Sequence, residues 1–546
     1  MKHKLLSLAI LTIVIVFGSY LRLVNLESNP NGLYVDEAST GYNAWSILLT
    51  GKDEYGKQNP VFFRFLGSYT PPLYTYLTAG AIQLFGFSIT SVRLVSAISG
   101  VLLIIVCFYL IRSLKIHRYW LTPFFWAFFL AISPWSIFYS RIGYEIHLGF
   151  LIYTMGLLFL WLSIKKLAYL IVAGCILALS TYTYQAERLL APLTFIVFLF
   201  IFRDFFRRGN RKILILTLVL IFLILIPQFL LILTPASSTR GFGLFYSDAI
   251  NQQAKQVGFL LAFLKEFFSQ YFAYFSPRNL FFQPDSDLQR SLPELSTFYP
   301  WMVVLYLTGI YFLPKLKSNA KKFILMLLLL APIPASLTGD PFSTQRALPL
   351  LLPVTLIIVI ALDRFIIILP KLFSGLVLIL CLVSLLYLYR SHAVLFPNER
   401  AKTWGFGFEQ LAMEIEKRPN EKFLIDTSRM KPAYIELAFF LKYPPLKFQE
   451  TIDQDVRTSY YQNTIWRSFY NFGQIETRDI TWEEDIYKNQ ILVGDELAIS
   501  EGQMNEHFLE KIFEIRDPVK MIIFQGYRTN PELKCSKQFI KEKCSI

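Results

Sequence analysis

The chain has few of the residues that build metal centres, disulfide scaffolds or nucleotide-hydrolysing sites. It contains only five cysteines and five histidines in 546 residues. Neither an HExxH motif nor a GxxxxGK[ST] phosphate-binding loop occurs in it. The sequence therefore offers no clear zinc site, gives no reason to expect a metal or another cofactor, and disfavours transport driven by nucleotide hydrolysis within this chain.

Charge is also scarce, and long apolar runs take its place. Charged residues make up 17% of the chain and hydrophobic residues 54%, against about 25% and about 45–50% in soluble domains. Runs of about 20 apolar residues, the length that a helix needs to cross a bilayer, recur through the first 390 positions. We expect a polytopic α-helical membrane protein with about eleven transmembrane helices. One uncleaved span lies within residues 1–27, and the others lie near 91–111, 119–138, 146–164, 167–184, 188–202, 213–233, 298–314, 323–338, 345–362 and 365–389.

The basic residues lie on one side of the expected membrane. The net charge is +14, although residues 391–546 hold 21 Lys or Arg against 24 Asp or Glu. With the N-terminus in the cytoplasm, the cytoplasmic loops are 111–118, 165–166, 202–212, 314–322 and 363–364, and nearly all are rich in Lys and Arg. This distribution follows the positive-inside rule, so topology explains the charge better than a nucleic-acid partner does. We expect a multi-pass protein of the cell membrane with its C-terminal part outside the cytoplasm.

Three long segments then fall on the extracytoplasmic side: residues 25–90, residues 234–297 and everything after 390. The first contains two aromatic, amphipathic stretches, ASTGYNAWSILLTG and PPLYTYLTAGAIQLFG, typical of helices along a membrane surface. After residue 390, a helix-like stretch (FGFEQLAMEIEKRP) accompanies strand-like runs (KFLIDT, QILVGD, KMIIFQGY). We expect a membrane domain over 1–390 and a small mixed α/β domain over 391–546, in which Cys535 and Cys544 can form a disulfide if that end is extracytoplasmic.

Two adjacent acidic residues, Asp36 and Glu37, open the first outer segment in the stretch NGLYVDEASTGYNAWSI (31–47). Neighbouring carboxylates repel each other, which can raise the pKa of one of them and suit it to proton abstraction. The alternative is structural, because acidic residues favour the first turn of a helix and a helix is expected from about Ala38. Taken alone, the stretch favours the structural alternative.

A cytoplasmic N-terminus, one span and a long outer loop that opens with an acid resemble the layout of GT-C glycosyltransferases. The stretch GLYVDEASTGYNAWSILLTG resembles the first-loop motif of the branch with protein O-mannosyltransferases and aminoarabinose transferases, glycosyltransferase family 39. YTPPLYTYLTAGAIQLFG followed by SVRLVSAISGVL resembles its continuation into the second span. The likeness extends in layout over about residues 1–390, and the tail matches no family that we can name.

The resemblance implies an integral-membrane, inverting glycosyltransferase. Such an enzyme moves a sugar from a polyprenyl-phosphate donor to an acceptor hydroxyl on a protein, lipid or glycan at the extracytoplasmic face. In the family the loop aspartate acts as general base, so the resemblance assigns that role to Asp36, with Glu37 beside it as a second catalytic candidate. The leaving group is a lipid phosphate, which needs positive charge beside it in the transition state.

Arg346 is the first candidate for that positive charge. It follows Gln345 in TGDPFSTQRALPLLLP (338–353), at the outer end of an expected span. The resemblance implies that Arg346 meets the lipid phosphate, with Gln345 beside it, and a guanidinium suits this task because it can bind two phosphate oxygens. The alternative, favoured by position alone, is an arginine that extends to the lipid headgroups at a helix end.

Two further outer turns carry polar candidates. FYSRIGYEIHLGF (138–150) contains Arg141, a second candidate for the phosphate, and Glu145, which could orient it or bind sugar hydroxyls; the alternative is a local ion pair at i, i+4. STYTYQAERLLAP (180–192) offers Tyr184 and Arg188 for the sugar or the acceptor. Aromatic residues are expected in any membrane-interface belt, and that alternative is favoured for this turn.

A polytopic transporter or flippase for a lipid-linked or small polar substrate is the main alternative from another functional class. Such a protein is expected to have paired repeats and polar or broken helices near the membrane centre, whereas most acids here lie at the outer ends of spans. The tail has only TIWRSFYNFG and ITWEED where oligosaccharyltransferases have a WWDYG-type motif. This difference argues against transfer of whole glycans to asparagine. A non-catalytic membrane scaffold is the third alternative.

Overall fold

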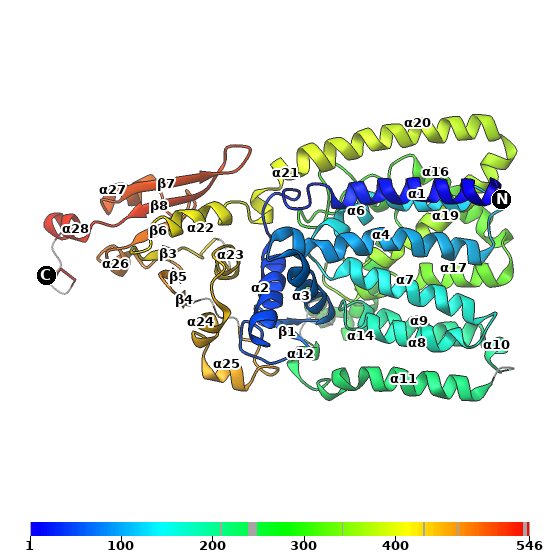
Figure 1. The fold of residues 1–546 in the computed structure, drawn as a ribbon, viewed down its shortest axis with the longest axis horizontal. Helices are drawn as coiled ribbons and strands as arrows, with labels where there is room; N and C mark the ends of the chain where they lie inside the picture. The colour runs from blue at the N-terminus through cyan, green and yellow to red at the C-terminus, as the bar shows by residue number, and fades with distance from the viewer. Residues whose placement is uncertain are drawn as a thin grey trace.

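Most of the chain is a bundle of apolar helices that run side by side, and the C-terminal domain lies at one end of it (Figure 1). The computed structural model describes residues 2–207, 210–238, 248–340, 342–429, 432–465, 467, 469–538 and 543–544. The bundle contains α1 (Lys2–Leu23), α4 (Ile89–Leu114), α5 (Thr122–Ala131), α6 (Pro134–Arg141), α7 (Ile146–Ser163), α8 (Tyr169–Ser180), α9 (Glu187–Ile201), α10 (Arg203–Arg207), α11 (Arg211–Leu230), α16 (Met302–Phe312), η2 (Leu313–Lys315), α17 (Ser318–Leu330), α18 (Ile333–Ser336), η3 (Leu348–Leu350), α19 (Leu351–Ile368) and α20 (Pro370–Leu388).

Seven helices among the described residues are long and apolar enough to cross a membrane, and α5 with α6 makes an eighth if this bent pair is one span. The pair is bent by 50°, at a break where Pro134 opens α6; proline lacks the N–H that would continue a helix and disfavours helical geometry in the residue before it. The polytopic helical architecture expected from the sequence is confirmed. Each of the eleven expected stretches is largely helical, but eleven complete spans stay a prediction.

α19 lies in the middle of the bundle. Its residues from Leu351 to Asp363 are all buried, whereas only about a fifth of the apolar window of α1 or α20 is buried. α16 approaches α19 closely at Gly309, where a Cβ atom would lie 2.1 Å from the carbonyl oxygen of Ile357. A glycine at such a crossing lets two membrane helices pack backbone against backbone.

We predict that Gly309→Ala lowers the thermal stability of the detergent-solubilised protein. The added methyl group has to push α16 away from α19, and overpacking of this kind costs about 1–3 kcal/mol. Gly375→Ala in α20 is the matched control, because a Cβ there meets nothing within 4 Å. A melting temperature equal to that of wild type for Gly309→Ala would show that the two helices are not held at this distance.

The first outer segment covers the end of the bundle that faces the C-terminal domain. It consists of α2 (Val35–Thr50), a hairpin of β1 (Phe63–Phe65) and β2 (Ser68–Thr70), and α3 (Leu73–Phe85). α2 crosses the ends of the bundle helices instead of running parallel to them (Figure 1). The second outer segment contains α12 (Pro235–Ser238), α13 (Asp248–Val257), α14 (Phe259–Ala273) and α15 (Pro277–Phe281), while residues 239–247 lie outside the described residues.

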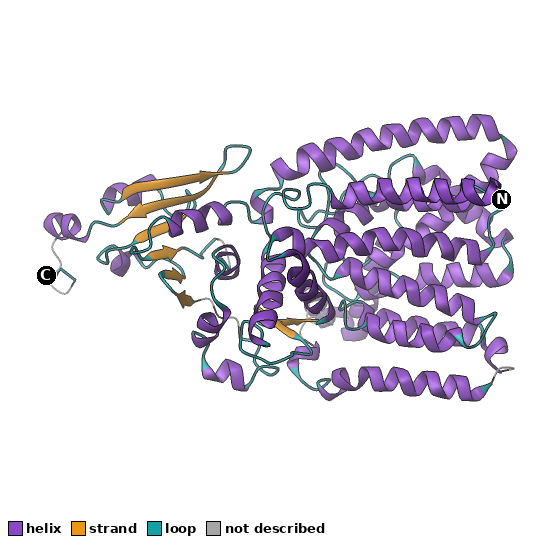
Figure 2. Cartoon of the chain, viewed as in Figure 1, coloured by secondary structure: helices purple, strands orange, loops and turns teal. Residues whose placement is uncertain are grey.

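The C-terminal domain is built on a six-stranded mixed sheet (Figure 2). The chain enters it through η4 (Tyr389–Leu395), α21 (Phe396–Glu399) and η5 (Lys402–Trp404), so helical structure crosses the expected boundary at 390. The strand order is β4 (Tyr470–Phe472), β5 (Ile475–Thr477), β3 (Phe423–Ile425), β6 (Ile491–Gly494), β8 (Ile522–Arg528) and β7 (Glu510–Arg516). β3 pairs in parallel with β5 and β6, and the other pairs are antiparallel. The helices are α22 (Phe408–Glu416), α23 (Tyr434–Phe440), α24 (Pro445–Glu450), α25 (Gln454–Thr458), α26 (Trp482–Asp485), α27 (Glu501–Glu506) and α28 (Pro531–Lys537).

The mixed α/β character expected for the tail is therefore confirmed. The three runs predicted as strands form β3, β6 and β8, and the predicted helix is α22. The sequence analysis missed β4, β5 and β7. A disulfide joins Cys535 and Cys544.

Buried polar contacts fasten the C-terminal domain to the first outer segment. The amide of Gln449 donates hydrogen bonds to the hydroxyl of Ser46 at 3.1 Å and to the backbone carbonyl of Asp53 at 2.9 Å. The hydroxyl of Tyr460 donates to the Asp53 carboxylate, and that of Tyr434 donates to the Glu54 carboxylate at 3.2 Å. Both acids are fully buried, so the domain covers them, and the domain is docked through groups that require hydrogen-bond partners.

We predict that the docked state loses stability as the pH rises from about 5 to about 8. Burial raises the pKa of Asp53 to about 6 and that of Glu54 to about 8. In the docked form Asp53 and Glu54 stay protonated at pH values at which they would lose their protons in an undocked, solvent-exposed loop. Raising the pH through this window therefore favours undocking. Thermal unfolding measured at several pH values should show this decline.

In that experiment Glu54→Gln should flatten the pH dependence, since an amide does not titrate. Glu496→Gln removes an exposed acid of the C-terminal domain and should leave the dependence unchanged. If the stability of Glu54→Gln depends on pH as steeply as that of wild type, groups other than Glu54 cause the dependence.

Candidate active site

Glu37 and Arg93 form a fully buried ion pair behind the first turn of α2. Two of the guanidinium nitrogens of Arg93 donate to the two carboxylate oxygens of Glu37, each at 2.8 Å, and both side chains are 0% exposed. Glu37 also accepts hydrogen bonds from the backbone N–H groups of Tyr34 and Gly143. Its carboxylate is thus engaged in an ion pair and two backbone contacts, which favours the structural alternative for Glu37.

Asp36 lies beside this pair, also in the first turn of α2, and its side chain is half-buried. Burial raises the pKa values of Tyr34 and Tyr144, and the negative charge of Asp36 makes the second-largest contribution in the same direction. Burial, with a smaller contribution from Asp36, raises the pKa of Glu436 to about 8. Since Glu436 belongs to α23 of the C-terminal domain, Asp36 lies at the junction of the membrane part and that domain.

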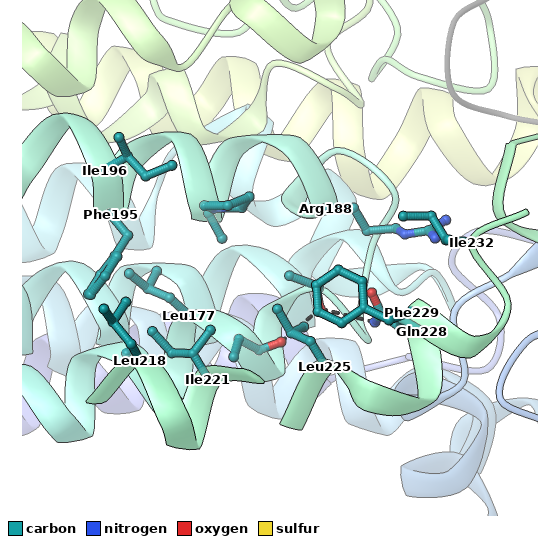
Figure 3. Close-up of a pocket in the computed structure, with 15 residues that line it drawn as sticks. Leu177, Arg188, Phe195, Ile196, Leu218, Ile221, Leu225, Gln228, Phe229 and Ile232 are labelled. Atoms are coloured by element: carbon teal, nitrogen blue, oxygen red, sulfur yellow. Dashed lines mark hydrogen bonds between the residues drawn. The ribbon is translucent and has the colours of Figure 1, made fainter. Parts of the chain in front are cut away.

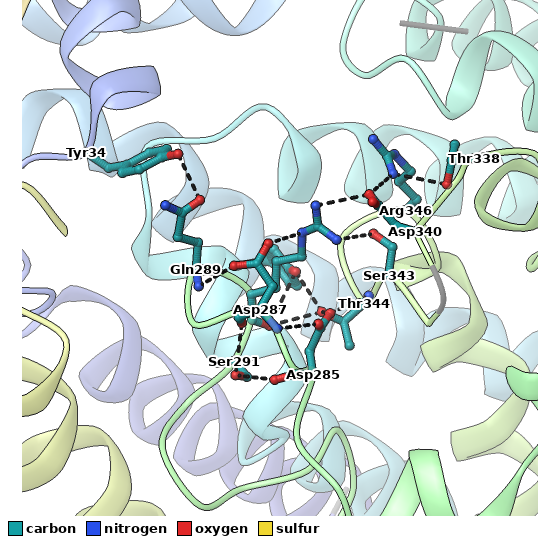
Figure 4. A network of polar contacts seen from close by, with 12 residues as sticks. Tyr34, Asp285, Asp287, Gln289, Ser291, Thr338, Asp340, Ser343, Thr344 and Arg346 are labelled. Atoms are coloured by element: carbon teal, nitrogen blue, oxygen red, sulfur yellow. Dashed lines mark hydrogen bonds and ion pairs between the residues drawn. The ribbon is translucent and has the colours of Figure 1, made fainter. Parts of the chain in front are cut away.

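A polar network extends from the residue before α2 to Arg346 (Figure 4). The Tyr34 hydroxyl donates to the side-chain carbonyl of Gln289 at 2.8 Å. The next residue, Arg290, forms ion pairs with Asp287 and Asp340, both at 3.1 Å, and Asp340 also pairs with Arg346. The network therefore connects the outer segment that carries Asp36 with the outer end of the helices before and after Arg346.

The ion pairs of this network also set the charge of its members. Burial lowers the pKa of Arg290, but the carboxylates of Asp340 and Asp287 outweigh this effect, so the pKa is raised overall. Burial raises the pKa of Asp340, but the neighbouring guanidinium groups of Arg346 and Arg290 outweigh this effect, so the pKa is lowered overall. Two guanidinium groups share the Asp340 carboxylate, and Arg290 has a second carboxylate partner in Asp287, so the charges of these four side chains balance.

Arg346 lines a cavity of about 190 Å³ together with two other residues predicted from the sequence, Tyr184 and Arg188. Gln345 lies half-buried beside Arg346 in the turn before η3. Asp36 does not belong to the described residues that line the Arg346 cavity. The structure thus brings Arg346, Tyr184 and Arg188 to one cavity, and the network above reaches the segment that carries Asp36 at Tyr34.

A second, apolar groove lies next to this cavity and shares one lining residue with it. It has a volume of about 400 Å³ and lies between α8, α9 and α11 (Figure 3). Its walls include Leu177, Phe195, Leu218 and Ile221, and Arg188 lines both the groove and the polar cavity. Arg188 thus has an apolar space on one side and the cavity of Arg346 on the other.

Arg141 and Glu145 are not at the Arg346 cavity. The Arg141 guanidinium is buried and donates to the backbone carbonyls of Leu21, Asn25 and Asn29 at 2.9 to 3.2 Å. It lines a separate cavity between α1 and α20. Glu145 is half-buried at the start of α7. The structure therefore separates the two arginines that the sequence analysis assigned to one phosphate.

Sequence analysis missed four charged residues of this region: Arg93, Asp287, Arg290 and Asp340. Signals for them were present, because Arg93 interrupts the apolar run of the second span and Arg290 follows two acids in an outer loop. Within the described residues, no group of three or more His, Cys, Asp or Glu side chains is arranged to hold a metal ion.

Comparisons with known proteins identify the fold of this chain. Residues 69–231 match the family model described as dolichyl-phosphate-mannose-protein mannosyltransferase. The structure is similar to that of ArnT from Cupriavidus metallidurans bound to undecaprenyl phosphate, with a TM-score of 0.55 and 13% identity over 94% of this chain and 97% of that one. The chain has the GT-C fold.

A second group of similar GT-C structures comes from archaea. The oligosaccharyltransferase AglB of Archaeoglobus fulgidus, in complex with an inhibitory peptide and a dolichol-phosphate, has a TM-score of 0.50 and 14% identity over 98% of this chain and 77% of that one. No curated protein matches the chain. The resemblance to GT-C glycosyltransferases that the sequence indicated is confirmed.

We predict that Glu37→Gln destabilises the GT-C bundle whereas Asp36→Asn does not. Removing one partner of a buried ion pair leaves the other charge uncompensated, at a cost of about 3–5 kcal/mol. Asp36 is half-buried and outside that pair, so its substitution is the matched control. Equal melting temperatures for the two variants in detergent would contradict a structural role for Glu37.

Proposed function

We propose that the protein is an inverting membrane glycosyltransferase that uses a polyprenyl-phosphate-linked sugar and an acceptor hydroxyl. The observation that carries this proposal is the position of Arg188, which lines both the apolar groove and the Arg346 cavity. An isoprenoid chain fits an apolar groove of this kind, and its phosphate requires cations at the polar end. The lipid phosphates in the ArnT and AglB structures support the same class of donor.

In this proposal Arg346 and Arg188 bind the donor phosphate. Arg346 donates to Thr338 at 3.0 Å and pairs with Asp340, and its side chain is 32% exposed, so part of the guanidinium faces the cavity. Arg188 donates to Gln185 and to the carbonyl of Ser237 through Nη1. The two cations stabilise the negative charge that grows on the phosphate oxygen as the sugar leaves. The proposed reaction needs no metal ion or other cofactor.

Asp36 is the general base in the proposed reaction. The acceptor oxygen attacks the anomeric carbon, the bond from that carbon to the phosphate oxygen breaks, and the hydroxyl proton passes to the Asp36 carboxylate. One displacement inverts the anomeric configuration and releases polyprenyl phosphate. The excess of Lys and Arg in the opposite loops supports an extracytoplasmic position of this site. The site is next to the C-terminal domain, which we propose contributes to acceptor binding.

The proposal is tested by separating donor binding from transfer. Binding of undecaprenyl phosphate to the purified protein is measured by native mass spectrometry, and transfer is measured with a set of undecaprenyl-phosphate-linked sugars presented with envelope extracts as acceptor. Asp36→Asn should bind the lipid phosphate as wild type does but transfer about 10²–10⁴-fold more slowly, as loss of a general base predicts. Arg346→Gln should weaken lipid-phosphate binding at least tenfold.

Arg390→Gln is the matched control for Arg346→Gln, because Arg390 forms an exposed ion pair with Glu294. It should bind and transfer as wild type does. Wild-type transfer by Asp36→Asn would refute the assignment of the base, and unchanged lipid binding by Arg346→Gln would refute the proposed phosphate site. Transfer that persists after EDTA treatment would agree with a metal-free reaction, and loss of transfer would contradict it.

A further inference from the structure

A third cavity lies at the other side of the bundle, between the end of α1 and the end of α20. It has a volume of about 570 Å³. Apolar side chains such as Phe17 and Leu385 line one part of it, and Asn29, Arg141 and His392 line another. Tyr20 and Tyr389, which also line it, are 60% and 66% exposed. The cavity is therefore amphipathic and opens to the surface of the bundle.

Two buried polar atoms at this cavity have no hydrogen-bond partner among the described residues. They are the side-chain carbonyl oxygen of Asn29 and Nε2 of His392. The side chains are 7% and 9% exposed, and the amide nitrogen of Asn29 is already used, since it donates to the backbone carbonyl of His392 at 2.7 Å. Buried polar atoms are almost always paired, so these two indicate a ligand that donates to the Asn29 oxygen and pairs with the imidazole.

The charge around the cavity is positive. Arg141 makes four hydrogen bonds, all to backbone carbonyls, and because a guanidinium has five N–H groups, one hydrogen on Nη1 is left. Arg22, which is near enough to interact electrostatically with Arg141, is also fully buried. Neither arginine forms an ion pair with a carboxylate in the described parts of the chain. Buried cations in a membrane protein require compensation, which an anionic ligand would provide.

The backbone is widened where the cavity forms. Residues Tyr389–Leu395 form η4, a π-helical segment between α20 and α21. Segments of this kind are rare and frequently occur at functional sites. Here the wide turn contributes Tyr389, His392 and Ala393 to the cavity wall, so the irregular segment and the unpaired imidazole coincide.

We propose that this cavity binds a phospholipid whose headgroup combines an anionic phosphate with a hydroxyl group, as in phosphatidylglycerol. The phosphate accepts hydrogen bonds from Arg141 Nη1 and from the His392 imidazole. The headgroup hydroxyl donates to the Asn29 oxygen, and the acyl chains lie along Phe17 and Leu385. The lipid comes from the leaflet next to the C-terminal domain. This site does not depend on the transfer reaction, because it shares no lining residue with the Arg346 cavity or the apolar groove.

The experiment measures binding of short-chain lipids to the delipidated full-length protein in detergent, by thermal shift and by native mass spectrometry. Dioctanoyl phosphatidylglycerol should bind at least tenfold more tightly than dioctanoyl phosphatidylcholine, which has the same phosphate and chains but no hydrogen-bond donor. Free glycerol 3-phosphate, the headgroup without chains, should give no shift at the same concentration. Ala393→Trp should fill the mouth of the cavity and abolish the preference for phosphatidylglycerol, and His392→Phe should do the same by removing the imidazole.

Val394→Trp is the matched control, since Val394 is exposed next to Ala393 and does not line the cavity. It should retain the preference. Equal binding of the two lipids would refute the proposed headgroup recognition. A preference that survives both Ala393→Trp and His392→Phe would place any lipid site elsewhere, and a shift with glycerol 3-phosphate alone would show a soluble-anion site instead of a lipid site.

Discussion

The geometry of the candidate active site depends on the buried contact between Arg93 and Glu37. Besides the two bonds to Glu37, the Arg93 guanidinium donates to the backbone carbonyls of Leu26, Glu27, Pro30 and Gly32 at 2.6 to 3.1 Å. One side chain thus holds the loop after α1, while its partner Glu37 holds the first turn of α2 and Gly143. Because Asp36 precedes Glu37, the position of Asp36 follows from this contact although Asp36 is outside it.

Two further buried arginines hold neighbouring parts of the same end of the bundle. Arg22 donates to the carbonyls of Gly18, Leu130 and Ala131 and to the hydroxyl of Ser136. Arg141 donates to carbonyls of the last turn of α1 and of the segment after it. The last carbonyls of a helix have no partner within it and carry partial negative charge that favours cations. In a membrane the unsatisfied carbonyls would be costly. Arg22 and Arg141 therefore satisfy several carbonyls at once, although these bonds leave their positive charges without a carboxylate partner among the described residues.

The sequence predicted the larger features and missed those that depend on tertiary contact. Apolar run length identifies helices such as α4 and α19 because the hydrocarbon thickness sets that length. The strands β3 and β6 were predicted because they are buried apolar runs in the middle of the sheet. β4, β5 and β7 carry exposed or polar residues, so their pairing partners and not their composition decide their structure. No local pattern could reveal that Arg93 pairs with Glu37 across 56 residues of sequence, or that Arg141 faces carbonyls instead of a phosphate.

The two parts of the candidate site differ in how firmly they are held. Asp36 is next to a bidentate buried ion pair, whose disruption costs several kcal/mol. The link from this part to the Arg346 cavity runs through the hydrogen bond between Tyr34 and Gln289, and a bond between neutral groups contributes about 1 kcal/mol. Arg290, Asp340 and Arg346 are themselves partly exposed, where ion pairs are weak. In the proposed reaction, a phosphate that competes with Asp340 for these arginines rearranges the loops around Gln289 and Asp340 more readily than it moves α2. The proposed donor then adjusts to a proposed base whose position is fixed.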